Sequence, residues 1–126
     1  MEMLGNTHLM EIPKTAFLCS RTIPASAVLK CYDWAIEQRE SGRCVVSGFQ
    51  SKLEKDVLHY LIQGSQPLTI VLARGMKKRI EPELQEALNN NRLLILTPFD
   101  ESINRVTAET AEKRNRTIVD SVINSR

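Results

Sequence analysis

The sequence predicts a Rossmann-like α/β fold, a three-layer α/β/α arrangement around a parallel sheet of about four strands. The first observation is a set of four short, almost continuously apolar runs, at residues 15–19, 43–47, 68–72 and 93–96. Apolar runs of this kind are typical of strands that are buried on both faces. The second observation is that segments with helical spacing separate the runs, as crossover connections between parallel strands require.

Signals at segment ends indicate four helices. Pro24 suits the first turn of a helix that reaches about residue 40. Ser51 and Glu54 have the spacing of a capping box, and Pro82 begins a third helix. The fourth helix is expected at residues 103–124. Right-handed crossovers would then give a doubly wound sheet with the strand order 3-2-1-4, counted along the chain, and helices on both faces.

The chain's 126 residues are enough for one domain with its own core. We assign this domain to residues 14–126. Residues 1–13 include Gly5, Asn6 and Pro13 among mixed side chains, so we expect a flexible N-terminal lead-in.

Net charge, cysteine and histidine content and hydropathy limit the kinds of site and the cellular location that this chain can have. The formal net charge is +2, so any anion site must be local. Cys19, Cys31 and Cys44 form no CxxC pair, and with two histidines in the chain we expect no metal and no other cofactor. No apolar stretch is long enough to span a bilayer, and no secretion signal is visible. These features indicate a reduced, cytoplasmic protein without membrane contact.

Ligands of such folds bind beyond the carboxyl ends of the strands. The loop after the second strand suits an anion best, because Gly48 allows a ligand to approach the backbone and amides at the Ser51 helix start point the same way. The alternative is an ordinary capped turn between strand and helix. Likewise, the cations at residues 74–79 could form a solvated loop, and the loop aromatics could cover the core instead of stacking on a base. The strand-end candidates are Ser20, Arg21, Ser47, Gly48, Phe49, Gln50, Ser51 and Arg74, with Phe99 as a second aromatic.

Two arginines flank an asparagine in the last predicted helix. Asn115 falls in the apolar row of that helix, so we expect it to be mostly buried and hydrogen-bonded. Arg114 and Arg116 offer donor forks suited to phosphate or carboxylate. The alternative is a solvated helix surface with ion pairs at (i, i+4), among them Glu112 with Arg116.

No enzyme signature is present: the chain has no GxGxxG, GxxxxGK[ST], GxSxG or HExxH. Glu54 is explained by its predicted capping role. We therefore expect a binding module rather than an enzyme.

Three segments in this order resemble the DNA-processing protein A family, within a Rossmann-like nucleotide-sensing group related to cytokinin-activating phosphoribohydrolases. They are Cys19-Ser20-Arg21, Ser47-Gly48 and Lys113-Arg114-Asn115-Arg116. The resemblance implies single-stranded DNA or nucleotide binding through a positive pocket at or near Arg21, Ser47, Gly48, Arg114, Asn115 and Arg116. It further implies a role in DNA uptake, natural transformation and processing, with delivery to a strand-exchange recombinase.

The chain departs from the family pattern at Cys19, Lys52 and Leu58, where the family has glycine, glycine and histidine. The family also continues past the position of Arg126 into another strand. We therefore expect an uncovered sheet edge, uncovered apolar residues Ile118, Val122 and Ile123, and homodimer formation through the last helix. The alternatives are hydrolysis of a nucleotide N-glycosidic bond, against which the missing PGGxGTxxE segment argues, and a shortened interaction or dimerisation domain that binds no ligand.

Overall fold

The computed structural model describes residues 1–19 and 22–124. In chain order the elements are β1 (Glu2–Gly5), the 3-10 helix η1 (Thr7–Met10), β2 (Lys14–Ala16), α1 (Ala25–Glu40), β3 (Cys44–Ser47), α2 (Lys52–Ile62), β4 (Leu68–Val71), α3 (Pro82–Asn89), β5 (Leu93–Thr97) and α4 (Ala108–Asn124). Among the described residues, none of these helices has the length and apolarity needed to cross a membrane.

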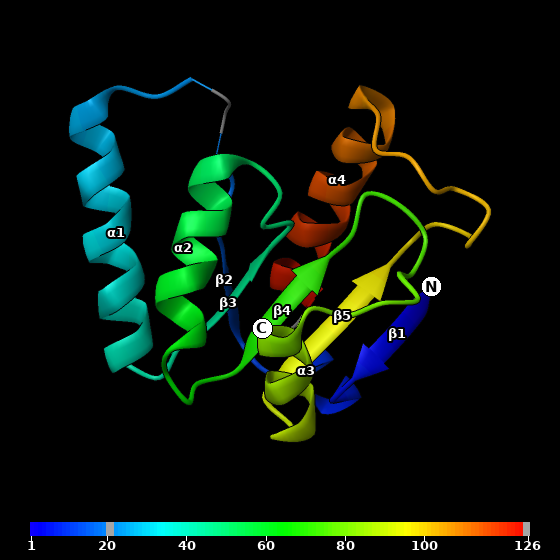
Figure 1. The fold of residues 1–126 in the computed structure, drawn as a ribbon, viewed down its shortest axis with the longest axis horizontal. Helices are drawn as coiled ribbons and strands as arrows, with labels where there is room; N and C mark the ends of the chain where they lie inside the picture. The colour runs from blue at the N-terminus through cyan, green and yellow to red at the C-terminus, as the bar shows by residue number, and fades with distance from the viewer. Residues whose placement is uncertain (20–21, 125–126) are drawn as a thin grey trace.

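One five-stranded sheet, in the order β1-β5-β4-β3-β2, forms the middle layer (Figure 1). The strands β2 to β5 are parallel, whereas β1 pairs antiparallel with β5. The predicted α/β class is confirmed, but the sheet is mixed and the predicted order 3-2-1-4 is wrong. Each crossover steps to the next strand in the same direction, so the parallel strands never reverse their order and the sheet is not doubly wound.

Side chains that alternate along the strands build a separate core on each face of the sheet. Val45 joins the core that includes Ala35 of α1, Val57 of α2 and Ala87 of α3. The next residue, Val46, joins the core that includes Ile118 of α4 and Leu9 of η1. Three helices therefore cover one face, and α4 with η1 covers the other.

The first thirteen residues differ from the expected flexible lead-in, because they contain β1 and η1 and complete the sheet. Gly5 makes the close approach possible: it has φ +104°, and a Cβ there would lie 2.3 Å from the Leu93 carbonyl oxygen. The Asn6 side-chain amide donates to the Asn91 carbonyl oxygen at 2.8 Å. Leu9 is buried in the core beneath η1. The N-terminal segment thus covers the β5 edge of the parallel strands.

The last helix begins at Ala108, five residues later than the predicted start at Ile103. Thr107 caps it: the Thr110 amide donates to Thr107 Oγ1 at 3.1 Å, and the Thr107 amide donates to Thr110 Oγ1 at 2.8 Å. Ile103 lies in the preceding loop, where its amide closes a turn on the Asp100 carbonyl oxygen. The expectation that Ile118 is uncovered is also wrong, because α4 packs it against the sheet with no exposed surface.

Candidate functional site

The buried row of α4 places an arginine where the sequence suggested an asparagine. Arg114, Ile118 and Ser121 are buried at the (i, i+4, i+7) spacing of one helix face, and Arg114 is only 7% exposed. Asn115 is half-buried. The prediction that Asn115 is mostly buried is therefore wrong, because its apolar row was anchored on Ile103, which lies outside the helix.

Two amide oxygens hold the Arg114 guanidinium. Its Nε donates to Asn115 Oδ1 at 2.7 Å, and its Nη1 donates to Gln50 Oε1 at 3.1 Å. The guanidinium also lies directly against Gly48, where a Cβ would come within 2.1 Å of Nη1. The predicted hydrogen bond of Asn115 thus exists, but its partner is the neighbouring arginine. Gly48 is needed because any larger residue would occupy the position of the guanidinium.

The turn between β3 and α2 does not present the open amides that we expected for an anion. The amides of Gln50 and Ser51 both donate to Glu54 Oε1 at 3.0 Å, and the Ser51 hydroxyl accepts from the Glu54 amide, which completes a capping box. The Phe49 amide donates to Ser47 Oγ at 3.2 Å. These four amides are therefore satisfied by the protein itself, because the Glu54 carboxylate and the hydroxyls of Ser47 and Ser51 take the place of a ligand.

Phe49 and Ser47 serve the core rather than a surface site. Phe49 has a positive φ of 47° and is 5% exposed, within the core covered by α1 to α3. Ser47 has no exposed surface. The left-handed backbone at Phe49 turns its ring inward, so it cannot stack on a bound base.

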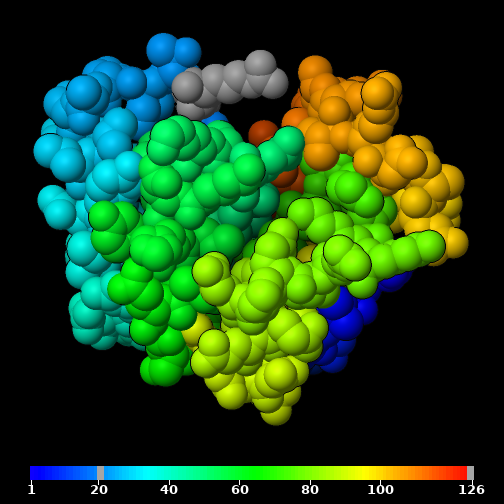
Figure 2. All heavy atoms as spheres, in the orientation of Figure 1, coloured from blue at the N-terminus to red at the C-terminus, as the bar shows by residue number. Residues whose placement is uncertain are grey.

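A cleft of about 810 Å³ lies in front of Arg114, between the β3–α2 turn, the first residues of the β2–α1 connection and the start of α4. Figure 2 shows the surface hollowed here, with α4 visible at the floor. Of the predicted residues, Gln50, Ser51, Arg114 and Asn115 line the cleft. Thr107 also lines it but was not singled out from the sequence; the spacing Thr107-x-x-Thr110, typical of a helix start, was the available signal.

Burial sets the electrostatics of the cleft. Burial lowers the pKa of the Arg114 guanidinium, and the nearby Glu54 carboxylate opposes this shift. Burial likewise raises the pKa of the Cys19 thiol at the cleft wall, with a further rise from Glu54. Within the described residues, Nη2 of Arg114 donates to no protein group and no carboxylate forms an ion pair with Arg114.

Two other predicted site residues, Arg116 and Arg74, do not line the cleft. Arg116 is on the exposed side of α4, where Nη2 lies 3.4 Å from Glu112 Oε1 in the predicted (i, i+4) pair. Arg74 lines a different cavity, which the β4–α3 and β5–α4 loops form. Ser20 and Arg21 lie outside the described residues. In the part of the chain that the structure describes, no three histidine, cysteine, aspartate or glutamate side chains gather to hold a metal ion.

Taken together, the molecule is a Rossmann-like α/β domain with a cationic cleft at the carboxyl ends of its strands. No family model matches the sequence, and no curated protein matches it. Two solved structures share the fold: DNA processing protein A from Helicobacter pylori, studied for its unique single-stranded DNA binding mode, and DNA processing protein A from Streptococcus pneumoniae.

Both superpose with a TM-score of 0.71 over 94% of this chain, at 18% and 21% sequence identity respectively. The chain spans 55% of the Helicobacter protein and 42% of the Streptococcus protein. The fold implied by the resemblance to this family is therefore confirmed.

Proposed function

We propose that this chain binds single-stranded DNA or a nucleotide-derived ligand, without catalysis, and that Arg114 receives a phosphate in its cleft. The observation that carries the proposal is a buried guanidinium without an ion pair among the described residues. A buried charge is costly unless it is paired. A phosphate that reached Nη2 would supply the missing partner through charge-assisted hydrogen bonds.

The neighbours in fold support a nucleic acid as the source of that phosphate. The Helicobacter protein binds single-stranded DNA. The Arg114 cleft opens at the carboxyl ends of the parallel strands, where ligands of open α/β sheets bind. Gln50 and Asn115 orient the guanidinium by accepting from it, so the fork is held in place before a ligand arrives.

No observation favours the hydrolase alternative. Cleavage of an N-glycosidic bond would need a carboxylate available to the ribose, and Glu54 is the buried carboxylate at this cleft. Glu54 Oε1 already accepts from the Gln50 and Ser51 amides as a helix cap. This engagement supports a structural role for Glu54.

A thermal-shift panel with a thymidine oligonucleotide, thymidine monophosphate and inorganic phosphate tests the proposal. A ligand present at about 100 times its dissociation constant should stabilise the fold by roughly 2.7 kcal/mol. We expect stabilisation by the oligonucleotide and unchanged ligand after incubation. If neither the oligonucleotide nor thymidine monophosphate stabilised the protein, the binding role would be refuted. Release of free base during the incubation would support the alternative function as an N-glycosidic-bond hydrolase.

The wider proposal is that the chain acts in the cytoplasm in DNA uptake and processing during natural transformation, passing the strand to a strand-exchange recombinase. The resemblance to the DNA-processing protein A family is its support.

Self-association through α4 is a further part of the proposal. Val119 and Ile123 on this helix are 42% and 62% exposed. A second copy is the simplest cover for them, since two-fold dimers are the commonest closed assembly. We expect light scattering at micromolar concentration to give a dimer mass that Ile123→Asp reduces to a monomer mass. Val122 is a poor choice for this test because it packs against the core. A monomer mass at every concentration would contradict the dimer.

A further inference from the structure

We infer that the loop between β4 and α3 supplies a second phosphate contact, so that the ligand is a single polynucleotide strand that spans two cavities rather than one nucleotide. This inference rests on the proposed function of the Arg114 cleft and adds to it the class of ligand.

The β4–α3 loop is anchored to the β5–α4 loop. The Gly75 amide donates to the Ile103 carbonyl oxygen at 2.7 Å, and the Thr97 hydroxyl donates to the Arg74 carbonyl oxygen. A Cβ at Gly75 would lie 2.4 Å from the Asp100 carbonyl oxygen, so the two loops are in direct contact. The backbone of Arg74 is therefore held in place at the end of β4.

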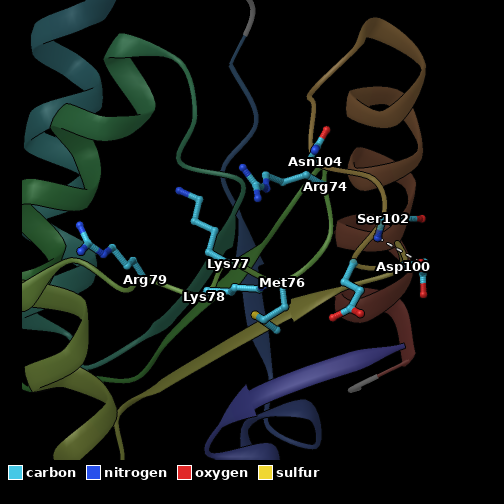
Figure 3. Close-up of a pocket in the computed structure, with 9 residues that line it drawn as sticks. Arg74, Met76, Lys77, Lys78, Arg79, Asp100, Ser102 and Asn104 are labelled. Carbon is cyan, nitrogen blue, oxygen red and sulfur yellow. Dashed lines mark hydrogen bonds between the residues drawn. The ribbon is translucent and has the colours of Figure 1, made fainter.

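Cations predominate in the cavity between these loops. This cavity has a volume of about 660 Å³, and its lining includes the cations Arg74, Lys77, Lys78 and Arg79 and the carboxylates Asp100 and Glu101. Figure 3 shows the side chains of Arg74 and Lys77 extending to the same side of the loop, away from Asp100. The Asp100 carboxylate accepts from the Ser102 amide at 3.1 Å. Arg74 and Lys77 thus lie on a different side of the cavity from the Asp100 carboxylate.

The protein itself neutralises this cluster only weakly. Lys77 Nζ lies 3.8 Å from a Glu81 carboxylate oxygen, and both side chains are substantially exposed. Exposed pairs of this kind contribute little, so a phosphate can compete for Lys77. Arg74 donates from Nε to the Gly75 carbonyl oxygen at 3.3 Å, which leaves its terminal nitrogens toward the cavity.

One segment forms a wall of both cavities. The β5–α4 loop lines the Arg74 cavity with residues 100–102 and Asn104, and it continues into the Arg114 cleft with Val106 and Thr107. Lys113 Nζ lies over the ring of Phe99 on this segment, 5.2 Å from the ring centroid. A single polynucleotide strand that lies along this wall would contact Arg114 at one end and Arg74 with Lys77 at the other.

This arrangement distinguishes a strand from a mononucleotide. A single phosphate can occupy only one of the two cavities, whereas a strand places successive phosphates along a path. Single-strand binding sites of comparable modules span about 4–16 nucleotides. Affinity should therefore rise with strand length until both cavities are filled.

The test compares Arg74→Ala/Lys77→Ala with Lys30→Ala/Arg43→Ala, a control that removes two exposed cations elsewhere in the protein. Fluorescence anisotropy would follow a labelled thymidine oligonucleotide of about 16 nucleotides across a salt series, with thymidine monophosphate as competitor. Each lost single-strand phosphate contact should reduce the salt slope by about 0.7. We expect a slope about 0.7 shallower in the Arg74/Lys77 variant, which loses the second phosphate contact, the unchanged slope in the control, and unchanged competition by the mononucleotide.

Two results would overturn the inference while leaving the Arg114 cleft intact: an unchanged slope in the Arg74/Lys77 variant, or equal affinity of the unmodified protein for mononucleotide and oligonucleotide. Absence of any binding by the unmodified protein would overturn both this inference and the proposed function. Equal losses in the control and the test variant would also overturn it, because they would indicate a general charge effect.

Discussion

Replacing Arg114 by methionine should weaken single-stranded DNA binding by about 10- to 100-fold, since a hydrogen bond to a charged group contributes about 1.5–3 kcal/mol. Methionine keeps much of the volume of the arginine but removes its charge and donors. Because Arg114 is only 7% exposed and has no ion pair among the described residues, its loss should not lower thermal stability greatly. Fluorescence anisotropy with a labelled oligonucleotide measures the binding, and a melting curve measures the stability.

Arg116→Met is the matched control for this prediction. It removes the same charge from the same helix, two residues away, but the Arg116 side chain is exposed and pairs with Glu112 outside the cleft. We expect this control to bind almost as tightly as the unmodified protein. Equal losses for both variants would mean that net charge, and not the cleft, determines affinity.

Replacing Gly48 by alanine should have nearly the same effect on binding, although it changes no charge. The new methyl group would lie 2.1 Å from Arg114 Nη1, so the guanidinium would have to leave its place and lose its bond to Gln50. The side chain is flexible at this end, so the fold should survive. The Gly42→Ala variant is the control, because a Cβ there meets nothing within 4 Å. Gly42 has φ +71°, so that change should cost about 1–2 kcal/mol of stability without affecting binding.

A double variant tests whether Gly48 acts through Arg114. Residues in contact give effects that do not add. In the Arg114→Met background, Gly48→Ala should therefore reduce binding little further. If the two losses added fully, Gly48 would have to contact the ligand by another route.

The four parallel strands and the helices between them could be predicted from the sequence, because buried parallel strands are continuously apolar and crossover helices carry clear start signals. The strand order could not, since Val45 and its neighbours indicate burial but not which strand lies beside them. The sequence does not indicate the β1 strand, because Glu2–Gly5 is short and all of its residues are exposed. Its hydrogen bonding to β5 is what makes it a strand.

The site was predicted in part for similar physical reasons. The spacing of Ser51 and Glu54 predicts the capping box correctly, but it does not reveal that the Glu54 carboxylate also accepts from the Gln50 and Ser51 amides, which a phosphate would need. The buried row of α4 contains Ile118 as expected, but the member before it is Arg114, four residues earlier, and not Asn115, three residues earlier. That one-residue shift is the difference between a buried Asn115 and a buried Arg114.

The salt dependence of oligonucleotide binding, compared between the unmodified protein and Arg114→Met, tests the central claim most directly. If Arg114 holds a phosphate in the cleft, its replacement should both weaken binding and make the slope of log K against log salt shallower by about 0.7. Identical affinity and slope in the two proteins would contradict a phosphate site at Arg114.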